Sequence, residues 1–357
     1  MVSIKDVARQ AGVSPSTVSL VLNGSDKVKT ETACKVRHVI EALHYIPNQA
    51  ARSLVTREKK VVSMIRISNS SIPNADGDLF DHAADTLIMD MLPGVQSVLS
   101  QYGYSLLIDF YVPLDAPLEQ IPVFDRKKID GAIFVGGMIS DEMAHKIRAS
   151  GIPSVFAYSR HDHIDYIDTD PELGIYLATS HLISLGHTDI VFINGSVHSQ
   201  TTELKMDGFC RALDDASLRL RPEWVTTADF TGKAGYEAIQ KLWALGIRPT
   251  AAVCACDSIA LGICRFLHEK GLRCPEDISI VGYESGILSM HSVPPMHSVY
   301  VSKQEIGAEA ANILINRIRN PKAPPVQRIL PSRLIPRASV APRKQPSTIS
   351  TEKEKTQ

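Results

Sequence analysis

The stretch "GVSPSTVSLVLNG", residues 12–24, decides how the N-terminal part of the chain folds. Ser14 followed by Pro15 is typical of a helix N-cap and a first helical position. Asn23 and the glycine after it predict the end of the same helix. The sequence therefore predicts one short helix that starts at Pro15 and ends before Asn23.

This helix has an apolar face and a small polar face. The apolar face consists of Val18, Val21 and Leu22. At 100° per residue, Ser16 and Leu20 lie opposite Val18, and Thr17 and Ser19 flank them. We expect the apolar face to pack inward and the hydroxyl-rich face to remain exposed.

Two further helices are predicted on either side. Ser3 stands three residues before Asp6, which is a capping-box spacing, and Gly12 ends the helix that follows. Thr30 is predicted to cap a third helix, and Pro47 lies just beyond its end. The apolar faces of these two helices are Ile4, Val7, Ala8 and Ala11, and Val36, Val39, Ile40 and Leu43.

Two helices joined across Gly12 and braced by a third make a helix-turn-helix whose second helix enters the major groove. Small hydroxyls can bond phosphates or base edges, and Leu20 can pack on a thymine methyl group. The alternative for Leu20 is an ordinary exposed leucine without a binding role. The predicted DNA contacts in this segment are Ser14, Pro15, Ser16, Thr17, Ser19, Leu20 and Asn23.

Charge is distributed unevenly along the 357 residues. Residues 1–60 carry ten Lys or Arg and five Asp or Glu, about +5, whereas the whole chain has a formal net charge of -1. A basic N-terminal segment on an acidic body suits a nucleic-acid-binding module. The sequence has neither a signal peptide nor an apolar run that could span a membrane, so we expect a cytoplasmic protein.

From Val61 onward, short β-rich runs alternate with helical stretches, which predicts parallel sheets with crossover helices. These units exceed one compact sheet, so two doubly wound lobes are expected. Ligands in such sheets bind beyond the carboxyl ends of the strands, here in the crevice between the lobes. The predicted strands are "VVSMIRI", "YSLLIDF", "IDGAIFV", "IPSVFAY", "DIVFIN", "AAVCAC" and "ISIVGY".

Both parts of the chain resemble one family. The segments "IKDVARQAGVSPSTVSLVLNG" and "VRHVIEALHYIPNQAARSL" resemble the head of the lactose/purine repressor family of bacterial transcription factors. "HLISLGHTDIVFING" and "VSKQEIGAEAANILINRI" resemble its effector-binding core, which is similar to periplasmic sugar-binding proteins. The resemblance implies a small all-α helix-turn-helix head and a two-lobed, doubly wound α/β core. Pro15 and Leu20 depart from the usual residues, which leaves the operator sequence open.

The segment "NQAARSLVT", residues 48–56, resembles the hinge helix of that family. It is too short to form a stable helix alone. The resemblance implies that two copies fold together on the operator and that Leu54 wedges into the minor groove, which kinks the duplex. Ala51 is small enough for close packing of the two copies, and Arg52 is placed to meet phosphate. The alternative is a plain linker.

The predicted domains are residues 1–47, a hinge at 48–60, a core at 61–340 and a disordered tail at 341–357. We expect the first lobe of the core to contain about 61–160 and 292–322. The second lobe is expected to contain about 161–291 and 323–340. The family resemblance implies that the protein is a homodimer or a higher oligomer.

Four residues at strand ends are predicted effector contacts: Tyr158, Lys205, Asp257 and Glu284. Their places match ligand-binding positions of the family, although three depart from its usual residue types. Lys205, for example, cannot reproduce the bidentate geometry of the usual arginine. Asp257 has an alternative explanation as a helix cap. Phe80, in a loop longer than the family's usual connection, is the fifth predicted contact; the alternative for this residue is a solvated side chain without a ligand.

The predicted function is that of a ligand-responsive transcriptional regulator, with repression as the expected mode, that binds a pseudo-palindromic operator as a dimer. A sugar or sugar derivative is the expected effector, with a nucleobase as the second choice. The rivals are an enzyme and a solute-binding protein on the same α/β body. No catalytic residue, cofactor or metal is predicted: dinucleotide-binding, P-loop and nucleophile-elbow motifs are missing. Cys254 and Cys256 suit an apolar core better than zinc.

Overall fold

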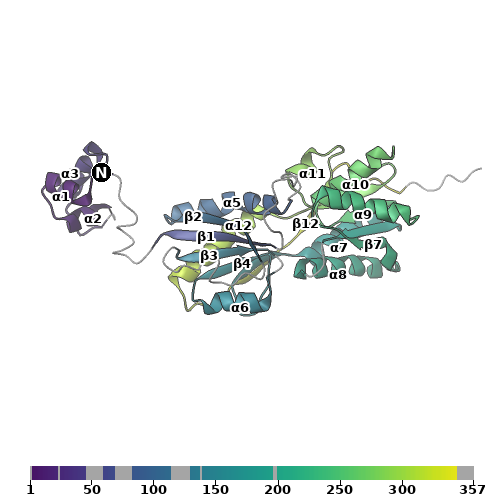
Figure 1. Cartoon of the computed structure of the whole chain (residues 1–357), viewed down its shortest axis with the longest axis horizontal. Coiled ribbons are helices and arrows are strands. Elements are labelled where there is room, and N and C mark those ends of the chain that lie inside the picture. The colour runs from purple at the N-terminus through teal and green to yellow at the C-terminus, as the bar shows by residue number, and fades with distance from the viewer. Residues whose placement is uncertain are drawn as a thin grey trace, which may run out of the picture. The chain divides into compact units, whose positions relative to one another are not determined.

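The computed structural model describes residues 2–22, 25–45, 59–68, 83–113, 129–136, 139–195 and 199–343. The chain divides into two compact units, residues 1–60 and residues 61–357 (Figure 1). The helices of the first unit are the regular elements of its described part, and the second unit contains two β-sheets.

Three helices form the described part of the first unit: α1 (Ile4–Ala11), α2 (Pro15–Leu22) and α3 (Thr30–Ala42). The Asp6 carboxylate accepts hydrogen bonds from the backbone N–H and the hydroxyl of Ser3, and Ser14 Oγ accepts one from the backbone N–H of Thr17 at 3.1 Å. Thr30 is the first residue of α3 and Lys29 occupies the cap, so the predicted cap is wrong by one residue. The buried side chains are Val7, Ala8, Ala11, Val18, Val21, Val36 and Val39.

Each lobe of the second unit is built on a six-stranded sheet. The first has the order β11-β5-β4-β3-β1-β2, and all its strand pairs are parallel. The second has the order β12-β10-β9-β8-β6-β7, and only β12 is antiparallel to its neighbour. The strands of the first sheet are β1 (Val61–Ser68), β2 (Ser105–Pro113), β3 (Gly131–Val135), β4 (Ser154–Ala157), β5 (Tyr166–Thr169) and β11 (Gln327–Leu330). Those of the second are β6 (Ile190–Asn194), β7 (Val225–Thr227), β8 (Ala251–Cys254), β9 (Ser279–Glu284), β10 (His297–Tyr300) and β12 (Arg333–Ile335).

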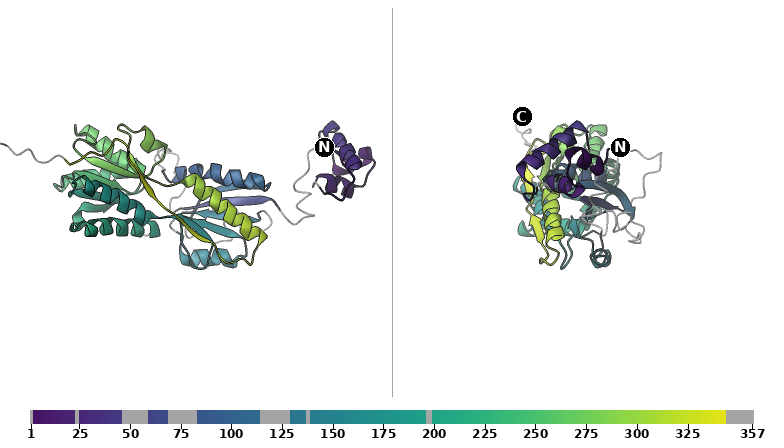
Figure 2. Two further views of the ribbon diagram at one scale, coloured as in Figure 1. Left: turned by 180° about the vertical axis from the view of Figure 1, so that it is seen from behind. Right: turned by 90° about the vertical axis from the view of Figure 1, so that its left-hand side faces the viewer.

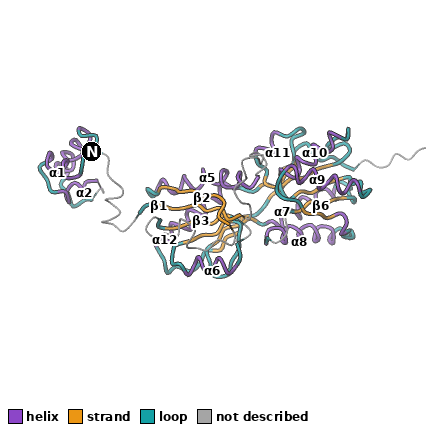
Figure 3. Tube along the Cα trace, in the orientation of Figure 1, coloured by secondary structure: helices purple, strands orange, loops and turns teal. Residues whose placement is uncertain are grey.

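Helices cover both faces of each sheet (Figure 3). Along β3, Ile133 packs into one apolar cluster and Phe134 into another, because successive side chains point to opposite faces of a strand. On β8, Val253 packs into the same cluster as Ile133, whereas its neighbour Cys254 packs into a separate cluster on the other face. The helices are α5 (Ala83–Gln101), α6 (Asp141–Ala149), α7 (Pro171–Ser184), α8 (Gln200–Asp215), α9 (Gly232–Ala244), α10 (Asp257–Glu269), α11 (Ile287–His291) and α12 (Lys303–Arg319).

In its described part, the chain passes between the lobes three times: between β5 and α7, between β10 and α12, and between β11 and β12. In Figure 2 the yellow C-terminal segment runs from one lobe into the other. The predicted lobe limits therefore need correction. Residues 166–169 and 327–330 belong to the first sheet, and 297–300 belong to the second. The pattern of hydrophobic runs could not reveal this, because it shows where strands lie and not which sheet they join.

The expected disordered tail starts too early. Ala341 accepts a hydrogen bond from His187 Nε2 at 2.9 Å, and its backbone N–H donates to Ser279 Oγ at 3.1 Å. Arg343 pairs with Asp189 at 2.8 Å. Residues 341–343 are thus fastened to the second lobe, and residues 344–357 lie outside the described segments.

Glycines let neighbouring helices of the core approach closely. A Cβ atom on Gly262 of α10 would lie 2.0 Å from the carbonyl oxygen of Gly232 and 2.7 Å from the backbone nitrogen of Tyr236, both on α9. We expect Gly262→Ala to lower the unfolding free energy by about 1–3 kcal/mol through overpacking. Urea unfolding measures the change, and Gly286→Ala, where a Cβ meets nothing within 4 Å, is the control. Equal stability of both variants would contradict the prediction.

Candidate operator and effector sites

The exposed face of α2 carries the residues predicted to contact DNA. Leu20 is 37% exposed, and Ser16 is exposed next to it, whereas Val18 is fully buried. Ser14 Oγ lies 2.6 Å from Ser16 Oγ and 2.9 Å from Thr17 Oγ1. A hydroxyl has one donor and two acceptor sites, so this network retains capacity for phosphates or base edges.

The remaining members of the predicted DNA face divide into two groups. Ser19 is partly exposed, as the helical wheel predicts, and Pro15 is exposed. Asn23, Ala51, Arg52 and Leu54 lie outside the described residues.

Four predicted effector residues lie at the carboxyl ends of strands or on helices beside them. Tyr158 directly follows β4, and Glu284 is the last residue of β9. Both have a positive φ, 64° and 104°, which non-glycine residues rarely adopt. Such strain is often found at functional sites, because the surrounding structure must maintain it. Phe80 lies outside the described residues.

Glu284 interacts electrostatically with the other three predicted contacts. Burial is the first cause that raises the pKa of Tyr158, and Glu284 raises it further. Burial likewise raises the pKa of Asp257 to about 6, with Glu284 contributing in the same direction. Glu284 partly counteracts the burial that lowers the pKa of Lys205 to about 8. Glu284 is thus close enough to Tyr158, Lys205 and Asp257 to act on their ionisation, and we call these four predicted contacts the effector cluster.

Lys205 and Tyr158 supply donors to this cluster. Lys205 Nζ donates to the carbonyl oxygen of Ala255 at 2.7 Å and lies 4.0 Å from the ring centroid of Tyr283. An ammonium group has three donor hydrogens, so others remain for a ligand. Tyr158 Oη is buried and has no hydrogen-bond partner among the described residues. Because an unsatisfied buried hydroxyl is costly, a ligand acceptor at Tyr158 would be favoured.

Asp257 does not cap α10, so the alternative explanation of this residue is wrong. Cys256 occupies the N-cap, and Asp257 is the first helical residue. The carboxylate of Asp257 instead accepts hydrogen bonds from Ser298 Oγ at 2.6 Å and from the backbone N–H of Gly286 at 3.1 Å. It therefore fastens β10 and the start of α11 beside the effector cluster.

Lys303 belongs to the same neighbourhood, although the sequence patterns did not single it out. It is the first residue of α12, and its Nζ lies 2.8 Å from Glu284 Oε2 and 3.0 Å from Asp90 Oδ2. The rule that ligand sites lie at the carboxyl ends of strands could have found it, because Lys303 stands three residues after β10.

The two cysteines considered for zinc lie in the apolar core. Cys254 and Cys256 are both buried in the second lobe, and burial raises the pKa of Cys256 to about 12. Among the described residues, no group of three or more His, Cys, Asp or Glu side chains has the geometry of a metal site.

Both units of the chain match known protein-family models. Residues 3–48 match the model described as "Bacterial regulatory proteins, lacI family". Residues 179–340 match a periplasmic binding protein-like domain. The HTH-type transcriptional repressor PurR of Actinobacillus pleuropneumoniae serotype 3 is 34% identical over 322 residues, which cover 89% of this chain and 92% of that protein. PurR of Haemophilus influenzae strain ATCC 51907 is 33% identical over 321 residues, 89% of this chain and 91% of that protein.

Solved structures of regulators share the whole architecture. The Lac repressor dimer bound to operator and the anti-inducer ONPF is 26% identical, with a TM-score of 0.80 and coverage of 95% of this chain and 99% of that chain. The complex of the transcriptional regulator CelR with cellobiose is 27% identical, with a TM-score of 0.68 and coverage of 95% and 100%.

The head, the two-lobed core and these relatives define a DNA-binding transcriptional repressor, not an enzyme. The chain belongs to the lacI family of bacterial regulatory proteins. Within its described segments, no helix is both long and apolar enough to cross a membrane.

Proposed function

We propose that this repressor binds a pseudo-palindromic operator as a homodimer and that a small molecule at the effector cluster sets its affinity. The observation that carries the proposal is that Tyr158, with a buried and unpaired hydroxyl, and Lys205, with donor hydrogens to spare, lie near Glu284 in a chain that also has a DNA-reading head. An effector that prefers one arrangement of the lobes shifts the population toward it and thereby changes operator affinity. A repressor acts on the chromosome, so we expect it in the cytoplasm.

The effector class is the finer part of the proposal. A sugar is the first candidate, because the cluster offers carboxylates and an ammonium group for hydroxyls, and because a similar regulator was solved with cellobiose. A nucleobase is the second candidate, supported by relatives that carry the name PurR. Thermal-shift measurements with cellobiose, ribose, hypoxanthine and guanine test both classes, because a ligand that binds the folded state raises its melting temperature. If only the purine bases raise it, the sugar proposal fails.

The hinge proposal predicts a selective loss of operator binding. We expect Leu54→Ala to weaken binding to the specific operator at least about tenfold and to leave non-specific binding nearly unchanged, because only specific binding uses the minor-groove wedge. Gel-shift titrations on an operator selected from random DNA, and on a scrambled duplex, measure the two affinities. Equal losses on both duplexes would contradict the wedge role. Absence of salt-sensitive binding by the wild type would reject operator binding itself.

Exposed apolar side chains support the proposed homodimer. Ile287 is 69% exposed, Met290 48% and Val293 93%. All three lie in residues 287–293, a stretch that consists of α11 and the turn after it. Met89 on α5 is 54% exposed. Gathered apolar side chains on a surface are typical of protein interfaces.

We expect Met290→Asp to raise the dimer dissociation constant at least about tenfold, because a charge would be desolvated in the interface. Sedimentation equilibrium of the full chain measures the change. Leu245→Asp is the matched control, because Leu245 is 74% exposed at the end of α9 in the same lobe. A dimer that both variants leave intact would place the interface elsewhere.

A further inference from the structure

Lys303 joins the two lobes through paired salt bridges. Its Nζ lies 2.8 Å from Oε2 of Glu284 and 3.0 Å from Oδ2 of Asp90, and its side chain is only 6% exposed. Glu284 ends β9 of the second sheet, whereas Asp90 lies on α5, which packs on the first sheet. One buried cation is therefore held by one carboxylate from each lobe.

Both carboxylates favour the charged form of Lys303. Burial by itself would lower the pKa of Lys303, but Glu284 and then Asp90 outweigh it, so the pKa is raised and the ammonium group stays charged. Removing one partner of a buried ion pair leaves the other charge without compensation. Glu284 and Asp90 therefore share one cation across the two lobes.

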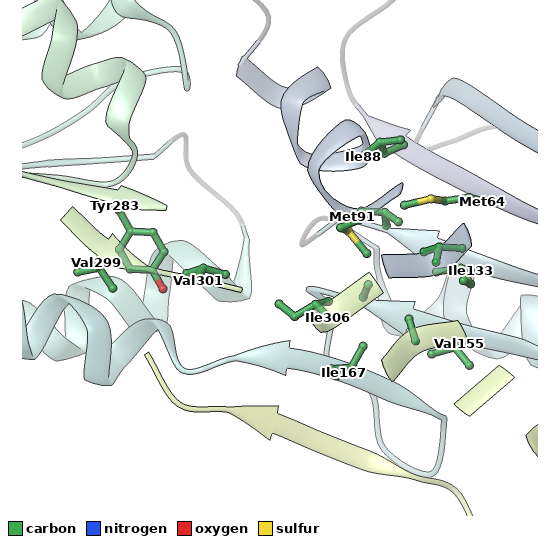
Figure 4. Close-up of a cluster of buried hydrophobic side chains, with 14 of the residues drawn as sticks. Met64, Ile88, Met91, Ile133, Val155, Ile167, Tyr283, Val299, Val301 and Ile306 are labelled. Carbon is green, nitrogen blue, oxygen red and sulfur yellow. The ribbon is translucent and has the colours of Figure 1, made fainter. Parts of the chain in front are cut away.

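Helix α12 packs closely against α5. A Cβ atom on Gly307 would lie 2.3 Å from the carbonyl oxygen of Met91, and one on Gly94 would lie 1.9 Å from that of Gln304. The two helices are thus in backbone contact. Figure 4 shows Met91 of α5 and Ile306 of α12 within the same group of buried apolar side chains.

We propose that Lys303 is a positioning residue that couples the effector cluster to α5. A ligand that binds the Glu284 carboxylate has to share it with Lys303, and the resulting shift in this ion pair reaches Asp90. Met89, the neighbour of Asp90, is one of the exposed apolar residues of the proposed dimer. A regulatory role of this coupling rests on the proposed function, whereas the ion pairs of Lys303 with Glu284 and Asp90 are observed in the structure.

Hydrogen exchange of α5 measured by mass spectrometry tests the coupling on the full chain, without DNA or effector. We expect Glu284→Gln in the second lobe to accelerate amide exchange in the peptide covering residues 87–97 about fivefold, because α5 loses part of its anchorage. Lys303→Met should have a similar effect. Adding Glu284→Gln to Lys303→Met should change the rate by less than about 1.5-fold, because the connection is already broken.

Two further variants make the result decisive. Asp90→Asn removes the carboxylate at the half-exposed end of the connection. This variant replaces Lys303→Met if Lys303→Met does not fold. Adding Glu284→Gln to Asp90→Asn should again change the exchange rate of α5 little. Gln200→Ala is the matched control. Gln200 also bridges the lobes, by hydrogen bonds of its side chain with the backbone of Arg160 at 3.1 and 3.0 Å, but it does not contact Lys303.

The coupling is overturned if Glu284→Gln leaves α5 exchange unchanged, if the effects of Glu284→Gln and Lys303→Met multiply, or if Gln200→Ala accelerates α5 equally. The last result would mean that any loosening of the lobes reaches α5. If the wild type binds no operator, the proposed function is rejected, but the hydrogen-exchange result still decides whether Lys303 couples Glu284 to α5.

Discussion

The Val18→Asp variant is expected to lose specific operator binding by more than about 100-fold, because the three-helix head should no longer fold. Val18 is fully buried in a cluster that has seven buried side chains in the described part of the head. A domain of this size buries little apolar surface and has a small stability margin. An unpaired carboxylate in its core costs several kcal/mol, which exceeds that margin.

The head and the core divide into separate compact units, so the damage should remain in the head. We expect gel shifts to show the loss of binding while the main thermal transition, from the core, is unchanged. Cys34→Asp is the matched control, because it places the same charge at an exposed position on α3. Operator binding by Val18→Asp at the wild-type level would contradict the assignment of this cluster as the core of the reading head.

The second large effect concerns the pH dependence of stability at Asp257. Burial raises the pKa of this carboxyl from 3.8 to about 6 in the folded protein. Between about pH 4 and pH 6 the folded protein therefore binds more protons than the unfolded chain, so this group makes stability fall as the pH rises through that range. The difference between the two pKa values corresponds to about 3 kcal/mol.

Asp257→Asn cannot ionise and should lack this contribution. We expect the unfolding free energy of the wild type, relative to the variant, to rise by about 2–3 kcal/mol between pH 7.5 and pH 4. Urea titrations of both proteins at matched ionic strength measure the difference. A parallel pH dependence of the two proteins would show that Asp257 titrates normally. Ser298→Ala removes one hydrogen bond to the carboxylate and should move the transition to higher pH.

Local signals in the sequence predict the helices of the head and the central strands of both sheets. Ser14, Pro15 and the apolar face around Val18 define α2 with the bounds found in the structure. The run "VVSMIRI" predicts β1, because a strand that is buried on both faces of a sheet shows a nearly continuous apolar run.

Features that depend on contacts between distant segments could not be predicted in this way. β7 has three residues, and β11 is mostly exposed, so neither shows a clear hydrophobic run. The effector cluster was found only through strand ends and a family resemblance. The role of Asp257 depends on Ser298, 41 residues away, and that of Lys303 depends on Asp90, 213 residues away. No local pattern records such partners.

The three passages of the chain between the lobes have a consequence for biosynthesis. The first sheet takes its edge strand β11 and its covering helix α12 from residues 303–330, although its other strands lie before residue 170. On the ribosome, the N-terminal part of that lobe must wait for more than a hundred intervening residues before it can close. The head needs only the first 45 residues. Nascent chains should therefore acquire a folded DNA-reading module well before either half of the sensor is complete.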